Sequence, residues 1–142
     1  MKVFLDTNIL LDWILHDRPF KEECEAILSA AKAGVIDVVV TTQSILDAHF
    51  TSKKAGIQYQ AFEHMINHLR SFSTINAIDW IDLSWATSHY SGDLEDDAQY
   101  ASAYNACCDF FITRDKKLME LNDPLNPMTV ISPDEFVAQM MG

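Results

Sequence analysis

Acidic side chains follow two of the apolar runs in this chain, at positions where they could meet. Asp6 ends the first run, Lys2–Leu5, and Asp115 comes just after the run Asp109–Thr113. In an open parallel sheet, ligands bind outside the carboxyl ends of the strands. If the two runs form neighbouring strands, their ends lie roughly 5 Å apart. The spacing therefore predicts that the two carboxylates share one edge of a sheet.

Further acids can reach the same edge from two predicted helices. Asp47 lies in the helix that is expected after a β-branched apolar run, and Asp93, Asp96 and Asp97 surround the start of a later helix. Asp93 precedes Asp96 by three residues and Asp97 by four, so each pair shares one helix face. Four separate segments can thus deliver carboxylates to one place.

Clustered carboxylates repel one another unless a cation or a proton lies between them. Two ionised carboxylates about 5 Å apart repel by roughly 3 kcal/mol at an effective dielectric constant of 20, which is large beside the marginal stability of a small domain. An oxygen-only ligand set favours Mg²⁺ or Mn²⁺ over zinc, and such an ion can activate water for attack on phosphate. The alternative, on spacing alone, is that these are ordinary solvated acids and helix caps, because 21 of the 142 residues are Asp or Glu.

The net charge of the chain argues against one class of function, the non-specific coating of DNA. Ten Lys and Arg residues against 21 Asp and Glu residues give a formal net charge of −11. An acidic protein repels nucleic acid at long range, which argues against a non-specific DNA-coating protein. A nuclease stays compatible with this charge, since acids that hold cations contribute to the same negative total.

Length, cysteines and hydropathy indicate a single domain, residues 1–142, in the cytoplasm. The chain is 49% hydrophobic, which is enough for one core. Cys24, Cys107 and Cys108 lack C-x-x-C spacing, and we predict that they are reduced and buried in a cytosolic protein. Asp6 and Asp12 interrupt the apolar runs at the start of the chain, so we expect neither a signal peptide nor a membrane span.

The sequence predicts strands that alternate with helices, and these elements would position the acids. This alternation favours a layered α/β fold with a mainly parallel central sheet. The stretch after Asp6 is predicted to be a turn or a helix cap. The predicted strands are Lys2–Leu5, Ile36–Val40, Thr74–Ile78, Asp109–Thr113 and Met128–Ile131. The predicted helices are Phe20–Ala31, Gln43–Lys54, Tyr59–Leu69, Asp82–His89, Glu95–Ala106, Lys116–Leu121 and a last one capped by Ser132 with Pro133 at its first position.

Four ordered motifs resemble those of PIN domains. They are the apolar strand that ends in Asp6-Thr7-Asn8, the stretch Thr42-Gln-Ser-Ile-Leu-Asp47, the stretch Asp93-Leu-Glu-Asp96-Asp97-Ala-Gln-Tyr-Ala-Ser-Ala, and Cys108-Asp109-Phe-Phe-Ile-Thr113-Arg114-Asp115. The order of the motifs matches the family, and the closing Val-Ile-Ser-Pro-Asp-Glu-Phe also fits. The likeness spans nearly the whole chain.

This resemblance implies a PIN-like three-layer α/β/α sandwich and a metal-dependent endoribonuclease that uses Mg²⁺ or Mn²⁺, as in the VapC toxins of toxin–antitoxin pairs. Its partners would be an RNA substrate and a cognate antitoxin, and the chain could also form a homodimer. Carried over residue by residue, Asp6, Asp96 and Asp115 match the metal-site acids of the family, and Asp47 completes the predicted catalytic set. The second motif usually carries Glu, so the shorter Asp47 would need a bridging water to reach a metal.

Neighbouring polar residues each have a functional and a structural interpretation. Thr7, Asn8 and Thr113 carry hydroxyl or amide groups that are suited to fixing the carboxylates, or they cap turns. Asp93 and Asp97 are predicted to support the site acids. Asp97 competes with Asp96 for the third acid position, but the register of the Gln-Tyr-Ala-Ser-Ala segment favours Asp96.

Basic residues flank the last acid of the set. We predict that Arg114, Lys116 and Lys117 contact RNA phosphates beside Asp115, and the alternative is that they are ordinary solvated charges.

Two other functions fit parts of the pattern. A non-catalytic PIN-like module that binds nucleic acid or protein would also explain Asp47, and metal-dependent cleavage of RNA separates it from the enzyme. A phosphatase of the haloacid-dehalogenase type would share an Asp at a strand end, but it normally needs an acid two residues later, where this chain has Asn8.

Overall fold

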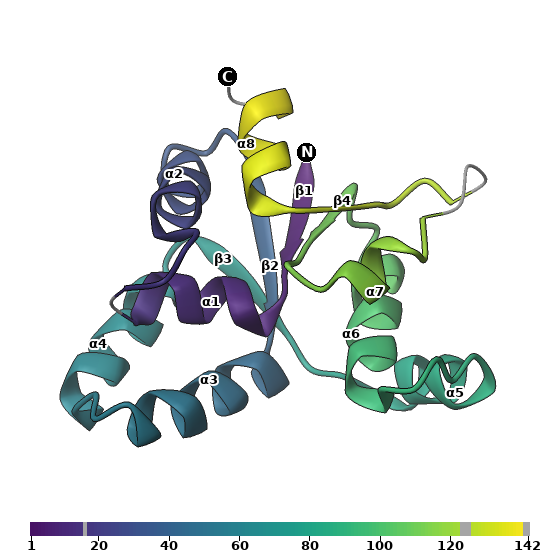
Figure 1. Ribbon diagram of the computed structural model, residues 1–142, viewed down its shortest axis with the longest axis horizontal. Helices are drawn as coiled ribbons and strands as arrows, with labels where there is room; N and C mark the ends of the chain where they lie inside the picture. Colours follow the sequence, from purple (N-terminus) through teal and green to yellow (C-terminus); the bar gives the residue numbers. More distant parts are fainter. Residues whose placement is uncertain (16, 123–125, 141–142) are drawn as a thin grey trace.

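The structure is a computed structural model that describes residues 1–15, 17–122 and 126–140. These residues form a five-stranded sheet with the strand order β3-β2-β1-β4-β5 (Figure 1). The strands are β1 (Lys2–Leu5), β2 (Asp37–Thr41), β3 (Ser73–Asn76), β4 (Phe110–Ile112) and β5 (Thr129–Ile131). All four pairings are parallel, which confirms the predicted α/β class and the parallel sheet.

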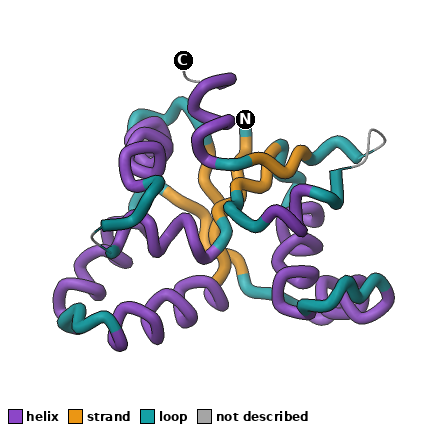
Figure 2. The backbone as a smooth tube through the Cα atoms, viewed as in Figure 1, coloured by secondary structure: helices purple, strands orange, loops and turns teal. Residues whose placement is uncertain are grey.

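Helices lie on both faces of this sheet (Figure 2). They are α1 (Thr7–Ile14), α2 (Lys21–Lys32), α3 (Thr42–Lys54), α4 (Tyr59–Arg70), α5 (Trp80–Ser88), α6 (Leu94–Asn105), α7 (Lys116–Met119) and α8 (Pro133–Met140). Within the described ranges, none of them is long and apolar enough to cross a membrane. The predicted strands and helices begin and end within two residues of the observed ones.

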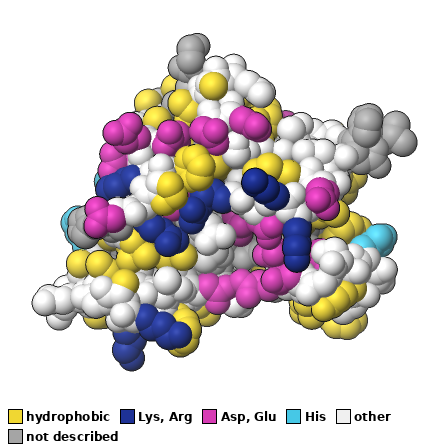
Figure 3. Space-filling view, in the orientation of Figure 1, with side chains coloured by type: hydrophobic (Ala, Val, Ile, Leu, Met, Phe, Trp, Pro, Cys, Tyr) yellow, Lys and Arg dark blue, Asp and Glu magenta, His cyan; other side chains and the backbone are white. Residues whose placement is uncertain are grey.

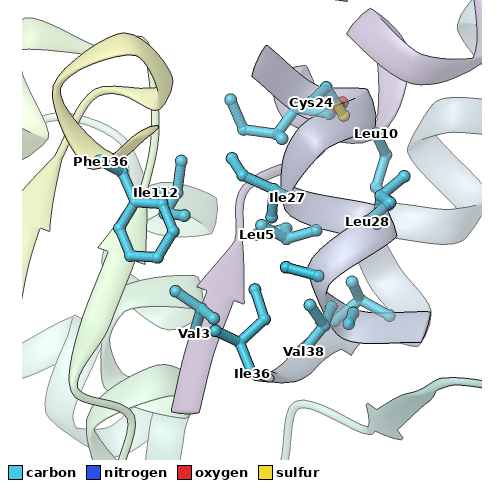
Figure 4. Close-up of a cluster of buried hydrophobic side chains, with 14 of the residues drawn as sticks. Val3, Leu5, Leu10, Cys24, Ile27, Leu28, Ile36, Val38, Ile112 and Phe136 are labelled. Atoms are coloured by element: carbon cyan, nitrogen blue, oxygen red, sulfur yellow. Dashed lines mark hydrogen bonds between the residues drawn. The ribbon is translucent and has the colours of Figure 1, made fainter. Parts of the chain in front are cut away.

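Alternate residues of the strands point to opposite faces of the sheet and build two cores. Val3 and Leu5 pack with α1, α2 and α8 in one cluster, to which Ile27 and Phe136 belong (Figure 4). Phe4 points to the other face, where its ring stacks on Phe111 at a centroid distance of 4.9 Å, below Tyr100 of α6. The helix–sheet–helix layers confirm the predicted three-layer sandwich.

Helix α1 is the main departure from the sequence-based prediction, which placed only a turn or a cap after the first strand. The Asp6 side chain caps this helix by accepting a hydrogen bond from the Thr7 amide. Ile9, Leu10, Leu11, Asp12 and Ile14 are all buried. Because this short helix is buried on nearly all sides, its sequence lacks the alternation of apolar and polar faces with a 3.6-residue period. Helices are predicted from that period, so α1 was not recognised as one.

The prediction of three buried cysteines is wrong for Cys107. All three cysteines are free, and Cys24 and Cys108 are buried, but Cys107 is exposed. Cys107 has φ +59 at the end of α6, where its amide donates to the Tyr104 carbonyl and the Cys108 amide donates to the Ala103 carbonyl. This left-handed helix-terminating turn is usually made by glycine, and it carries the Cys107 side chain into solvent.

We therefore predict that Cys107→Gly stabilises the protein by about 0.5–1 kcal/mol. Glycine relieves the strain of the positive φ but adds conformational freedom to the unfolded chain, which offsets part of the gain. Urea denaturation under reducing conditions measures the change. Cys107→Ala is the matched control, because it removes the thiol and keeps the strain. Equal unfolding free energies for the two variants would contradict the prediction.

Candidate active site

The end of β1 lies beside the end of β4, as the sequence predicted. Leu5 pairs with Ile112, and the Asp6 amide donates to the Ile112 carbonyl oxygen at 3.1 Å. The chain builds β2 and β3 on one side of β1 and then returns to place β4 on the other side. Asp6 thus stands at the point where the strand order reverses, which is where ligands bind in folds of this kind.

A chain of hydrogen bonds connects Asp6 to Asp115. Asp6 is 5% exposed, and it accepts from the Thr7 amide at 2.8 Å through Oδ1 and from the Thr113 hydroxyl at 2.8 Å through Oδ2. The Thr113 Oγ1 in turn accepts from the Asp115 amide at 3.0 Å. Asp115 caps α7 by accepting from the Lys117 amide. Thr113 therefore contacts both the Asp6 carboxylate and the Asp115 backbone.

Helix α6 brings Asp93 and Asp96 to the same place. Asp93 caps the helix by accepting from the Asp96 amide at 3.1 Å. Burial raises the pKa of Asp96 to about 7, with further contributions from the charges of Asp6 and Asp93 and from a hydrogen bond with Asp115. Burial also raises the pKa of Asp6, against the lowering effect of the bonds from Thr113 and Thr7. Asp6, Asp96 and Asp115 are therefore close enough to influence one another's charge.

Asp47 meets an acid that sequence analysis did not select, Glu95. The hydrogen bond from Glu95 to Asp47, together with burial and the charge of Asp47, raises the pKa of Glu95 to about 8. The charges of Asp93 and Asp96 act on Glu95 in the same direction. The Asp47–Glu95 pair thus extends the group of acids from α6 to α3.

A buried polar network fixes how α3 packs against α6. The Gln99 side chain donates to Ser44 Oγ at 2.8 Å and accepts from the Thr41 hydroxyl at 2.9 Å. Thr7 also donates its hydroxyl to Ser44 Oγ at 2.9 Å. Gln99 follows Glu95 by four residues, so both face α3. Sequence analysis missed Glu95 and Gln99 because the contacts that single them out are made with α3, far away in the chain.

Two of the predicted supporting residues do not contact the acids. Asp97 is buried and accepts from the Ser91 amide at 2.8 Å and from the Ser91 hydroxyl at 2.6 Å, so it holds the loop before α6. Asn8 is half-buried, and its side chain forms no hydrogen bond with the described part of the chain. Asp96 and not Asp97 faces Asp115, in agreement with the register of the third motif.

The basic residues beside Asp115 divide into two kinds. Lys116 and Lys117 are exposed. Arg114 instead forms an ion pair with Asp12, with its Nε 3.2 Å from Oδ2 and its guanidinium 5.7 Å from the centre of the Phe20 ring. Asp12 is fully buried and was read in the sequence only as an interruption of an apolar run.

A hollow of about 700 Å³ opens beside the acids. It is lined by Ser91, Gly92, Asp93, Asp96, Asp115, Lys117, Leu118, Glu120 and Leu121. In the space-filling view, Asp and Glu side chains gather in the middle of one face, with Lys and Arg side chains along their border (Figure 3). The hollow is large enough to admit part of a polymer to the acid cluster.

The donor set fits a hard divalent cation, because every charged group that converges here is a carboxylate. Burial raises the pKa of Asp6 and of Asp96, and the charges of neighbouring acids add to the effect, so a bound cation would stabilise the ionised carboxylates. No three His, Cys, Asp or Glu side chains of the described residues already surround one point in the way that metal ligands do. Asp93, Asp96 and Asp115 therefore line one hollow and Asp6 is buried, but the described acids do not form a finished coordination shell.

Comparison with known proteins agrees with this geometry. Residues 2–117 match the PIN domain family. A chain of a toxin–antitoxin complex from Klebsiella pneumoniae shares the fold, with a TM-score of 0.65 and 20% identity over 92% of this chain and 97% of that one. The sarcin–ricin loop cleaving toxin VapC20 of Mycobacterium tuberculosis also has a TM-score of 0.65, with 8% identity over 80% of this chain and 90% of its own. No curated protein matches the sequence. Because the PIN domain family matches most of the chain, this protein belongs to that family.

Proposed function

We propose that the protein is a metal-dependent endoribonuclease that hydrolyses phosphodiester bonds of RNA, and that it is the toxin of a toxin–antitoxin pair. The observation that carries the proposal is the meeting of Asp6, Asp96 and Asp115 at the switch point of the sheet, beside an open hollow. Membership of the PIN domain family and the likeness in fold to a chain of a toxin–antitoxin complex and to a cleaving toxin support it. An antitoxin and the RNA are the proposed partners, and the cytoplasm is the proposed compartment.

In this proposal Asp6, Asp96 and Asp115 hold Mg²⁺ or Mn²⁺. When bound, such a cation withdraws negative charge from the phosphate and lowers the pKa of a neighbouring water, so that the water can attack phosphorus. The Thr113 hydroxyl holds the Asp6 carboxylate and, by accepting from the Asp115 amide, fixes the backbone of Asp115. Lys117, which lines the hollow, can neutralise the charge of an adjacent phosphate.

Asp47 and Glu95 have a joint role in the proposed site. The second motif of the family usually carries Glu, and Asp47 is one methylene shorter. Glu95 lies in hydrogen-bond contact with Asp47 and extends its carboxyl group toward the charges of Asp93 and Asp96. We therefore assign to Asp47 the orientation of Glu95 and of the water near it, with no direct metal contact.

Asp6→Asn should lower metal-dependent cleavage of RNA by about 100-fold or more and leave the fold intact. Asn can still accept from the Thr7 amide, and it can donate to Thr113 if the hydroxyl of Thr113 rotates, while one negative charge leaves the buried cluster. Cleavage of a labelled RNA with Mg²⁺, Mn²⁺ or EDTA measures the effect, and thermal unfolding checks the fold. Asp37→Asn, at the exposed start of β2, is the matched control. Full activity of Asp6→Asn in a preparation free of other nucleases would show that the site is misassigned.

Asp47→Ala should reduce cleavage by roughly 10–100-fold, the range seen when a group that orients metal ligands is lost. Glu95→Gln should give a loss of similar size, and the double variant should lose little more, because the two residues act as one pair. If both single variants cleave like the wild type, α3 contributes no functional acid and the site reduces to three residues. If the wild type itself never cleaves RNA with either metal, the chain is the non-catalytic binding module.

The stability of the metal-free protein should fall as the pH rises from about 5 to 8. Asp96 and Glu95 keep protons in the folded state up to about pH 7 and 8 but lose them near pH 4 when unfolded, so the folded state binds more protons in this window. Stability then decreases with increasing pH. Thermal unfolding in EDTA measures the trend, and Asp96→Asn should flatten it. Mg²⁺ should stabilise the wild type more at pH 8 than at pH 5, because the cation and the protons both relieve the repulsion between the carboxylates. Equal stabilisation by Mg²⁺ at both pH values would argue against a metal site made by these acids.

A further inference from the structure

Asp12 and two arginines form a second charged group, separate from the acid cluster. Asp12 on α1 is fully buried, with Arg18 Nε 3.3 Å from its Oδ1 and Arg114 Nε 3.2 Å from its Oδ2. Both Nε atoms are also buried. The separations are those of ion pairs, and none of these four atoms has a partner with hydrogen-bond geometry among the described residues. One buried carboxylate thus holds two guanidinium groups next to each other.

Both arginine side chains remain partly accessible to solvent. The side chains of Arg18 and Arg114 are 28% and 23% exposed. Their buried Nε atoms donate to no acceptor in the described part of the chain. Two arginines that served only to neutralise Asp12 would direct these nitrogens at its oxygens. The group therefore presents two partly exposed guanidinium groups and, with Asp12 ionised, a net charge of +1.

This arginine pair lies close to the acid cluster along the chain. Arg114 stands between Thr113 and Asp115, which both belong to the cluster. Asp12 follows Asp6 by six residues of α1, or roughly 9 Å along the helix axis. Figure 3 shows Lys and Arg side chains at the border of the central acids on this face. A ligand that lies across the acids therefore lies near the backbone of Arg114.

We propose that Arg18 and Arg114 bind a phosphate of the RNA backbone within one or two nucleotides of the cleaved bond. The inference rests on the proposed function. A strand that enters an acid cluster in a protein of net charge −11 needs local cations to hold it. Planar guanidinium groups match phosphate oxygens through paired N–H bonds. Asp12 is a positioning residue, because its buried charge keeps the two arginines from repelling each other.

Binding of single-stranded RNA without cleavage tests the arginine pair. The probe is a fluorescein-labelled octanucleotide in EDTA, with Kd measured by anisotropy over a range of KCl concentrations. Arg18→Gln should raise Kd about five- to tenfold and reduce the slope of log Kd against log salt by roughly 0.7, the value of one phosphate contact to a single strand. The Arg18→Lys variant should keep the salt slope of the wild type but bind the RNA more weakly. Lysine keeps the positive charge but loses the paired N–H bonds of the planar guanidinium group. Lys53→Gln, an exposed lysine at the end of α3, should match the wild type.

Asp12→Asn gives a test of opposite sign. The substitution makes the protein less negative, so charge alone would strengthen binding of RNA. The proposal expects weaker binding, because the arginines lose the charge that orders them. Thermal unfolding shows which variants fold. If Asp12→Asn and Arg18→Gln do not fold, Arg18→Lys, which keeps a charged partner for Asp12, provides the test in their place. Tighter binding by folded Asp12→Asn would overturn the positioning role.

The outcomes separate this inference from the proposed nuclease. If the wild type cleaves RNA and Arg18→Gln has an unchanged Kd and KM, the arginine pair is structural and the inference is wrong. If Arg18→Gln weakens RNA binding while the wild type cleaves nothing with Mg²⁺ or Mn²⁺, the phosphate site stands and the nuclease does not. If Arg18→Gln loses only the binding of a labelled oligoglutamate peptide, the pair faces an acidic protein segment and the inference is again wrong. With an active wild type, a higher KM at unchanged kcat supports the inference.

Discussion

The parallel pairing of β1 with β4 is the constraint on which the candidate site depends. Leu5 pairs with Ile112, so the next residues along both strands, Asp6 and Thr113, become neighbours and form a hydrogen bond of 2.8 Å. A shift of this pairing by one residue would turn every side chain of the strand to the opposite face. Side chains that now face one core would then face the other side of the sheet. The shift would also move Asp6 away from Asp115. The packing of Phe4 and Phe111 on one face, and of Leu5 and Ile112 on the other, therefore also determines where the acids stand.

Helix ends reduce the electrostatic penalty that this arrangement creates. Asp6, Asp93 and Asp115 cap α1, α6 and α7, and each accepts a hydrogen bond from an amide of the first turn. The partial positive charge at a helix N-terminus stabilises a nearby carboxylate by typically 0.3–1 kcal/mol. Three such ends at one edge of the sheet offset part of the repulsion even before a cation binds. The fold thus holds the acids together, and bound metal need not assemble them.

The sequence predicted those parts of the site that depend on local pattern. Asp6, Asp96 and Asp115 follow strand ends or helix starts, and hydrophobic periodicity locates such points within two residues. It did not predict the contacts that form between elements far apart in the chain. Gln99 lies 55 residues from Ser44, and the pairing of Asp12 with Arg114 depends on how α1 lies against the turn after β4. Such pairs follow from packing angles between helices, which no local pattern contains.

The buried network around Ser44 implies that folding and activity place different demands on this sequence. Thr41, Ser44 and Gln99 satisfy one another inside the protein, so replacing any of them leaves a buried donor or acceptor without a partner. The neighbouring acids repel one another, and neutralising one of them relieves the folded state of that repulsion. In a saturation library, a screen for soluble expression would conserve the network and tolerate loss of the acids, whereas a screen for the proposed toxic activity would conserve both. Positions required for function could then be separated from positions required for structure by comparing the two selections, without measuring any reaction.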